Sequence, residues 1–266
     1  MALPGGRVLV GSEDPDHPEE WPVREVEVAA YQIGRCAVSN AEYARFVEAT
    51  GHRSDAERYG WSFVFGGLLP DDFPPTRGVA AAPWWREVAG ADWAHPEGPH
   101  SSVAQRLDHP VVHVSRRDAE AYAAWCGARL PTETEWEHAA RGGLVGQPFP
   151  WGSELQPGGE HRMNVWQGTF PSQNTAADGW RGTCPVDAFS PNGYGLHNTT
   201  GNVWEWCAGA WSDLDSTDAA GVSRGGSYLC HASYCRRYRV CARQPHAADS
   251  SVGNLGFRIA ASVAVP

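Results

Sequence analysis

The sequence predicts an α+β fold with little regular secondary structure, and three observations favour this class. Thirty glycines and twenty prolines, nearly a fifth of the 266 residues, interrupt helices and strands throughout the chain. Only three segments carry the periodicity and end signals of a helix, and the remaining apolar runs are as short as strands. Thirteen tryptophans provide bulk for a core, so the composition is not that of a disordered chain.

The expected organisation is a single domain over residues 1–266. A chain of this length can bury roughly 70 to 75% of its unfolded surface. No internal repeat, linker or low-complexity segment divides the sequence. One large core is therefore expected rather than two small ones.

The first regular elements are a short strand and a capped helix. Val26 and Val28 have the two-residue spacing of a strand. Ser39 and Glu42 form a capping-box pattern, and Gly51 marks the end of the helix that follows.

Two further helices are expected in the middle of the chain. One covers residues 115–126, with Asp118 completing the N-terminal cap. The other begins at Thr132, pairs this cap with Glu135 and ends at Gly142. The residues between the first and second helices are expected to be mostly irregular, with few periodic runs. Those after the third helix are expected to be turns with short apolar pieces that could be strands. Long irregular stretches in a compact domain usually carry function or position it.

The net charge of −10 argues against a general nucleic-acid binder, because a phosphate backbone requires a basic surface. All 21 basic residues are arginine, and four of them lie close together, which leaves either an acidic ligand or a structural ion-pair network open there: Arg236, Arg237, Arg239 and Arg243. The N-terminus lacks the pattern of a signal peptide, and no apolar run has the ~20 residues needed to cross a bilayer. The expected location is the cytoplasm, with no membrane partner.

Seven cysteines in a chain of this length are an odd number without a dense disulfide pattern, so most are expected to be reduced. Cys230 and Cys235 stand out, because residues five apart converge in a turn but not on a helix. Such a pair is compatible with structural cysteines, a dithiol redox pair or a site for a soft ion such as Cu(I). Zinc is disfavoured because its further ligands are missing.

Two other patterns have a structural and a metal-binding interpretation. His109 and His113 are expected to lie on one face of a strand as structural histidines. Oxygen-rich side chains among glycines suit either turns or a calcium site: Asn164, Asp178, Asp187, Asn192 and Asn198.

The chain resembles the formylglycine-generating enzymes, also called sulfatase-modifying factors, and resembles their bacterial type. The resemblance rests on RGGSYLCHASYCRRYRVCAR (224–243) and DSSVGNLGFR (249–258). Other matching runs occur in the same order along nearly the whole chain: SFVFGG (62–67), AAPWWREV (81–88), HPEGP (95–99), DHPVVHVS (108–115), RLPTETEWEHAARGG (129–143), FPWG (149–152) and NGYGLHNTTGNVWEW (192–206).

The resemblance implies a C-type-lectin-like variant fold and an oxidoreductase activity. Enzymes of this family convert the cysteine of a Cys-x-Pro-x-Arg segment in an unfolded sulfatase to Cα-formylglycine, consuming O2 and a thiol reductant with the help of copper. Cys230 and Cys235 match the catalytic pair that holds Cu(I), and Ser227 and Tyr234 match polar positions of the same pocket. The resemblance further implies a substrate groove formed by four residues: Ser62, Trp84, Arg243 and Asn254.

Two structural calcium sites are also implied by the resemblance. The first comprises Asn164, Val165, Asp178 and Trp180, with Val165 and Trp180 contributing backbone carbonyls. The second comprises Asn192, Gly193, Gly195 and His197.

The chain departs from secreted members of the family at positions that carry disulfides there. These positions are Ala123, Ala140, Val240 and Ile259, so the corresponding bridges cannot form, which fits a cytoplasmic enzyme. Ala232 replaces a position that is often polar in the family, which bears on contacts with substrate.

Two rival functions come from other classes. A non-catalytic binding module is possible on the same lectin-like scaffold, because one fold hosts many functions. An iron-dependent sulfoxide synthase shares the family signature, but those enzymes resemble longer chains with an added helical domain.

Overall fold

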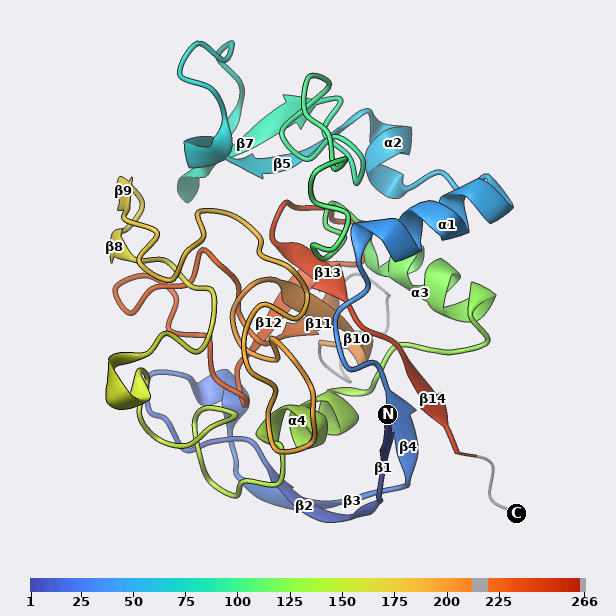
Figure 1. Cartoon of the computed structure of the whole chain (residues 1–266), viewed down its shortest axis with the longest axis vertical. Coiled ribbons are helices and arrows are strands. Elements are labelled where there is room, and N and C mark those ends of the chain that lie inside the picture. The colour runs from blue at the N-terminus through green and yellow to red at the C-terminus, as the bar shows by residue number, and fades with distance from the viewer. Residues whose placement is uncertain (212–219, 264–266) are drawn as a thin grey trace.

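The computed structural model describes residues 1–211 and 220–263. At its centre lies a four-stranded sheet in the order β12-β11-β10-β13 (Figure 1). Its strands are β10 (Trp204–Ala210), β11 (Ala220–Arg224), β12 (Arg243–Ala247) and β13 (Leu255–Phe257). β10 pairs antiparallel with β11 and parallel with β13, while β12 forms an edge of the sheet.

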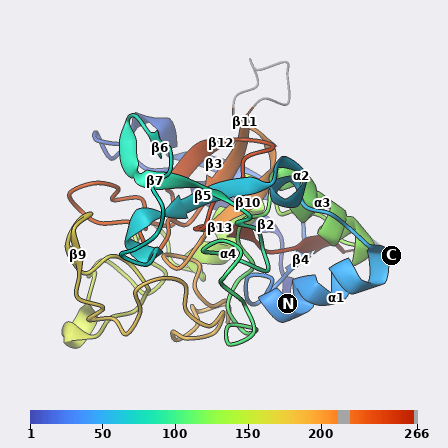
Figure 2. The ribbon, with the colours of Figure 1, turned by 90° about the horizontal axis from the view of Figure 1, so that it is seen from above.

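Smaller sheets surround this centre. One joins β1 (Ala2–Leu3), β4 (Tyr31–Ile33) and β14 (Ala260–Ser262), and another joins β5 (Trp61–Phe65), β7 (Ala82–Ala89) and β6 (Gly78–Val79). Two hairpin-like pairs are β2 (Gly6–Val10) with β3 (Arg24–Val28), and β8 (Gly168–Thr169) with β9 (Gln173–Asn174). Seen from above, β5 and β7 lie across the central sheet (Figure 2), and Phe63 of β5 forms a bridge to Val252, just before β13.

The three helices predicted from capping patterns are confirmed as α1 (Asn40–Thr50), α3 (Arg116–Trp125) and α4 (Glu133–Arg141). Each begins with a complete capping box, in which the N-cap hydroxyl and the third side chain bind each other's backbone N–H. The strand predicted around Val26 is β3. The described residues also contain three short 3₁₀ turns: Pro18–Glu20, Gly66–Leu68 and Pro157–Gly159.

The prediction of an irregular segment between the first two long helices is wrong in part. This segment contains α2 (Asp55–Tyr59) and the strands β5, β6 and β7. β5 was missed because four of its five residues are apolar, so its sequence lacks the polar–apolar alternation by which a half-exposed strand is recognised.

The predicted strand at His109 and His113 is also wrong. His113 has a left-handed backbone with φ of 58°, which a strand does not contain. The structural interpretation of both histidines fits their contacts, since His109 Nδ1 lies 2.9 Å from Thr183 Oγ1 and His113 Nδ1 lies 2.8 Å from Ser62 Oγ.

Aromatic packing between the helices and the central sheet forms the largest part of the core. Tyr43 of α1 and Tyr122 of α3 stack at 5.9 Å, and both meet Phe257 of β13 edge to face. Beneath them Arg258 and Glu205 form a fully buried ion pair. This rigid centre fixes the loops that carry the candidate site.

The cluster of four arginines is a structural network rather than a free cationic patch. Each guanidinium contacts a carboxylate from a distant part of the chain: Arg236 binds Asp14, Arg237 binds Glu19, Arg239 binds Glu20 and Arg243 binds Glu133. In the part of the chain that the structure describes, no helix is both long and apolar enough to traverse a bilayer.

Candidate active site

The two cysteines singled out by their spacing converge in the structure. Cys230 Sγ and Cys235 Sγ lie 3.1 Å apart, and both residues are buried. All seven cysteines of the chain are free thiols. A pair of unbonded sulfurs this close fits a dithiol or a two-sulfur site for a soft cation such as Cu(I).

Backbone geometry brings the sulfurs together. Gly226 has φ of 75°, and a Cβ at this position would lie 2.7 Å from the carbonyl oxygen of Arg237. Glycine therefore allows the cysteine loop to pack directly against the segment that leaves it. Within the loop, the backbone N–H of Cys235 donates to the carbonyl of His231 at 2.8 Å, closing the turn between the two thiols.

The two thiols differ electrostatically. Complete burial, together with the hydrogen bond shared with Cys235, raises the pKa of Cys230 well above its ordinary value. The same sulfur–sulfur hydrogen bond lowers the pKa of Cys235 against the effect of burial, and the backbone N–H and charge of Arg237 lower it further. The first proton lost by the pair therefore leaves a thiolate on Cys235.

Ser227 and Asn254 form a hydrogen-bonded pair beside Cys230. Ser227 Oγ accepts from Asn254 Nδ2 at 2.8 Å and from the backbone N–H of Leu229 at 3.3 Å. These two bonds occupy both lone pairs of the hydroxyl, so its own proton is available as a donor. The Ser227 backbone N–H lies 3.4 Å from Cys230 Sγ.

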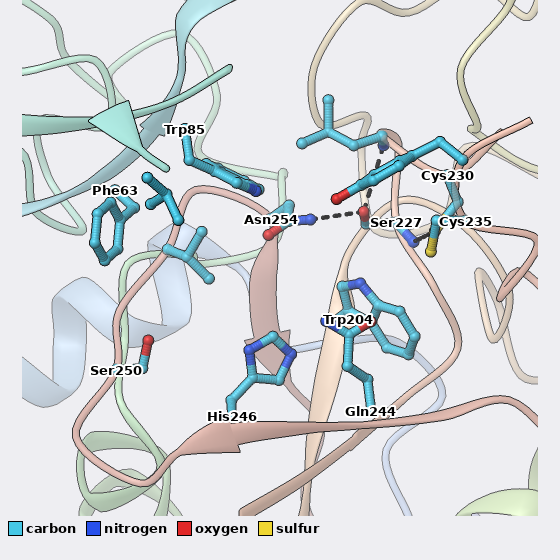
Figure 3. A pocket seen from close by; sticks show the side chains of 14 residues that line it. Phe63, Trp85, Trp204, Ser227, Cys230, Cys235, Gln244, His246, Ser250 and Asn254 are labelled. Carbon is cyan, nitrogen blue, oxygen red and sulfur yellow. Dashed lines mark hydrogen bonds between the residues drawn. The ribbon is translucent and has the colours of Figure 1, made fainter. Parts of the chain in front are cut away.

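The sulfurs lie at the wall of a cavity of about 210 Å³. Its lining comes from β5, β6, β7, β10, the cysteine loop, β12 and the loop before β13, and Figure 3 shows a close view. Besides Cys230, Cys235, Ser227, Tyr234 and Asn254, the lining consists of Phe63, Val79, Trp85, Trp204, Leu229, Gln244, His246, Ser250 and Val252. An open cavity with two thiols, aromatic walls and several polar groups can admit the side chain of a ligand.

Tyr234 is held by aromatic contacts. Its ring stacks on Phe170 with centroids 4.4 Å apart and planes within 4° of parallel, and it meets Trp84 edge to face at 4.8 Å. Burial and the nearby Cys235 raise the pKa of Tyr234, so its phenol stays protonated at neutral pH. The side chain is 44% exposed and remains accessible from solvent.

Only one of the four predicted groove residues lines this cavity, namely Asn254. Ser62 is fully buried and donates to the carbonyl of Ser251 at 2.9 Å. Trp84 does not line the cavity but packs edge to face against Tyr234, which does. The guanidinium of Arg243 binds both oxygens of Glu133 and covers the Trp211 ring.

Sequence reasoning did not select several lining residues. Trp85, Gln244 and His246 belong to this group, although the two-residue spacing of Gln244 and His246 could have placed them on one face of a strand. Their approach to the cysteines depends on how β12 is paired in the central sheet.

The first predicted calcium set contains a carboxylate without a cationic partner among the described residues. Asp178 Oδ2 accepts from the backbone N–H of Val165 at 2.9 Å, and Oδ1 accepts from that of Trp180 at 3.1 Å. Burial raises the pKa of Asp178 despite these bonds. The Asn164 side chain lies nearby but donates to the carbonyl of Gly182. A partly buried carboxylate of this kind fits Ca²⁺, which takes oxygen ligands.

The second predicted set fits calcium less well. Asn192 Oδ1 already accepts from the backbone N–H groups of Tyr194 and Leu196. The carbonyls of Gly195 and His197 accept from Arg35 and Arg258, and neither of these residues nor Gly193 brings a carboxylate. The guanidinium groups place positive charge beside two of the expected ligand oxygens.

Comparisons with known proteins agree with this architecture. The family described as sulfatase-modifying factor enzyme 1-like domain matches residues 1–263. The formylglycine-generating enzyme of Thermomonospora curvata is 55% identical over 98% of this chain and 92% of its own. A Bos taurus protein named inactive C-alpha-formylglycine-generating enzyme 2 is 46% identical over 100% of this chain and 89% of its own.

A solved structure shares the fold. The structure of PvdO from Pseudomonas aeruginosa superposes with a TM-score of 0.72 at 25% identity, covering 99% of this chain and 94% of that one. The predicted α+β class with little regular structure is thereby confirmed. Together these matches define a protein with the sulfatase-modifying factor fold, and the chain belongs to the formylglycine-generating enzyme family.

Proposed function

We propose that this protein converts the cysteine of a Cys-x-Pro-x-Arg segment in an unfolded sulfatase to Cα-formylglycine. The observation that carries the proposal is the buried, unbonded pair Cys230 and Cys235 at the wall of an open cavity. Membership of the formylglycine-generating enzyme family supports it independently. We further propose a cytoplasmic location, which fits seven free thiols.

The proposed reaction changes a –CH2–SH group into an aldehyde. One O2, together with two electrons and two protons from a thiol reductant, balances the release of one hydrogen sulfide and one water. Cu(I) held by Cys230 and Cys235 would supply the O2 and one-electron chemistry that protein side chains lack.

The side chains of the chain itself have separate tasks in this proposal. Cys235 is the thiolate of the pair and Cys230 its hydrogen-bonded partner, which makes the site anionic before a soft cation binds. Ser227 presents its hydroxyl proton toward the reacting groups and is held in place by Asn254. Tyr234 closes one side of the cavity with a protonated phenol.

We also propose that a calcium ion with a structural role binds at the set that contains Asp178. An ion there would neutralise the unpaired carboxylate and join the chain near Val165 to the loop at Trp180. It would stabilise irregular segments that lack strand-to-strand hydrogen bonds. The second calcium set stays a prediction.

The test combines metal binding with turnover. Wild-type protein should bind one Cu(I) and convert a Cys-x-Pro-x-Arg peptide to the aldehyde in the presence of O2 and thiol, as followed by mass spectrometry. Cys230→Ala and Cys235→Ala should lose both properties, whereas Cys126→Ala, which changes an exposed thiol away from the site, should keep them. Full activity in either pair variant would refute the proposal.

A non-catalytic binding module is the second candidate, because a relative at 46% identity carries the name of an inactive enzyme. Such a module would bind the peptide without converting it. Stoichiometric Cu(I) binding that depends on Cys230 and Cys235, together with aldehyde formation, would exclude this candidate.

A further inference from the structure

His246 lines the same cavity as the two cysteines but comes from a different element. It lies on β12, the edge strand of the central sheet, two residues after Gln244. Figure 3 shows both side chains rising from β12, with the cysteines across the cavity. This part of the lining has no role in the chemistry assigned to the sulfur pair.

The imidazole of His246 is packed against two indoles. Its centroid lies 6.4 Å from that of Trp204 and 5.6 Å from that of Trp206, both edge to face. Nε2 is shielded from solvent and has no hydrogen-bond partner within residues 1–211 and 220–263, and Nδ1 is not among the shielded atoms that lack a partner there. Burial lowers the pKa of His246 to about 4, so the ring is neutral at neutral pH.

A neutral imidazole carries one N–H and one lone pair, and the surroundings determine their positions. An N–H directed at an indole ring is a weak but favourable contact, whereas a lone pair directed at the same electron-rich face is repelled. A proton on the shielded Nε2 is compatible with the two indoles that pack against this ring. The lone pair of Nδ1 is then available to the cavity as a hydrogen-bond acceptor.

We propose that Nδ1 of His246 accepts a hydrogen bond from a backbone N–H of the bound substrate peptide and so positions the peptide opposite the cysteines. This inference rests on the proposed function, since it concerns the same peptide. No arginine, lysine, aspartate or glutamate lines the cavity among the described residues, and a backbone N–H can be buried against a neutral imidazole without the cost of burying a charge. An extended peptide offers such N–H groups at regular intervals.

The free protein gains no hydrogen bond from His246 in the described part of the chain. If His246 served only the fold, its replacement would destabilise the protein. His246→Phe retains an aromatic ring against Trp204 and Trp206 but removes both nitrogens, so peptide binding should weaken while the melting temperature does not fall.

The experiment measures Kd and KM for a Cys-x-Pro-x-Arg peptide and for copies in which single backbone N–H groups are methylated. For the wild type, methylation at one position should weaken binding about three- to tenfold beyond the other positions. His246→Phe should weaken binding of the unmodified peptide by the same factor, with kcat at saturation unchanged, and should be insensitive to methylation at that position. His100→Phe, at an exposed site, is the matched control.

The outcomes separate this inference from the proposed function. If the wild type converts the peptide while His246→Phe leaves Kd and KM unchanged, or if methylation weakens both proteins equally at every position, the inference is overturned. If binding depends on His246 as expected but no aldehyde forms, the proposed function fails and the inference stands. If the wild type neither binds nor converts the peptide, both are overturned.

Discussion

Replacing His113 by asparagine should remove a pH-dependent part of the stability of this protein. His113 is completely buried, and burial lowers the pKa of its imidazole to about 4. Its Nδ1 lies 2.8 Å from Ser62 Oγ, and the lowered pKa keeps the ring neutral at neutral pH. The amide of asparagine can donate a hydrogen bond to this hydroxyl or accept one from it, and asparagine tolerates the left-handed backbone at this position and does not titrate.

The magnitude follows from the pKa difference between the folded and unfolded chain. In the unfolded chain a histidine takes up its proton near pH 6.5, whereas folded His113 does so near pH 4. Between these values the unfolded state binds more protons, so the stability that this residue provides is present above pH 6.5 and is lost as the pH falls. The contribution lost between pH 7 and pH 5 is about 2 kcal/mol.

Urea unfolding at both pH values measures this effect. The difference in unfolding free energy between the wild type and His113→Asn should shrink by about 2 kcal/mol when the pH is lowered from 7 to 5. Other titrating groups contribute equally to both proteins and cancel.

A difference that stays constant between the two pH values would refute the reasoning. It would mean that His113 takes up a proton in the folded state, and hence that its environment accommodates an imidazolium. A parallel shift of both proteins to lower stability in acid would not count against it, because the comparison concerns only their difference.

Three further predictions concern the calcium set, the core and the active site. Asp178→Asn should abolish the rise in melting temperature that calcium produces in the chelator-treated wild type, and an equal rise in the variant would argue against this ion site. Glu205→Gln should lower the unfolding free energy by about 3 to 5 kcal/mol, since it leaves the buried charge of Arg258 uncompensated, and urea unfolding would contradict this if the loss were below about 1 kcal/mol. Asn254→Ala should lower kcat/KM for the peptide by up to about tenfold because it releases the hydroxyl of Ser227, and unchanged peptide kinetics would show that this hydrogen bond has no part in turnover.

Local signals in the sequence were sufficient for the elements that depend only on neighbouring residues. The capping boxes at Ser39, Ser115 and Thr132 predicted three helices correctly, because cap and helix are formed within a few residues of each other. The same holds for the glycine-rich, loop-dominated character of the chain. The strands β5 and β7 escaped detection because their residues do not alternate between polar and apolar, so pairing between segments about twenty residues apart had no local signal.

The candidate site was likewise predicted from the sequence only in part. The spacing of Cys230 and Cys235 predicted that they could converge, and the run of residues around them indicated the family. The spacing could not decide between a disulfide, a thiol pair and separated cysteines, since that depends on a turn closed by His231 and on glycines with left-handed backbone.

What the sequence by itself determined is therefore the type of protein, the capped helices and the identity of the two sulfur residues. Only the tertiary structure decided which residues face those sulfurs. Ser62 and Arg243 do not line the cavity, because Ser62 is hydrogen-bonded to the carbonyl of Ser251 and Arg243 forms an ion pair with Glu133. His246, which the sequence did not single out, does line it. The physical reason is that the position of β12 depends on its pairing with β11 in the central sheet. Such pairing between separate strands cannot be recognised from the few residues that surround His246 in the sequence.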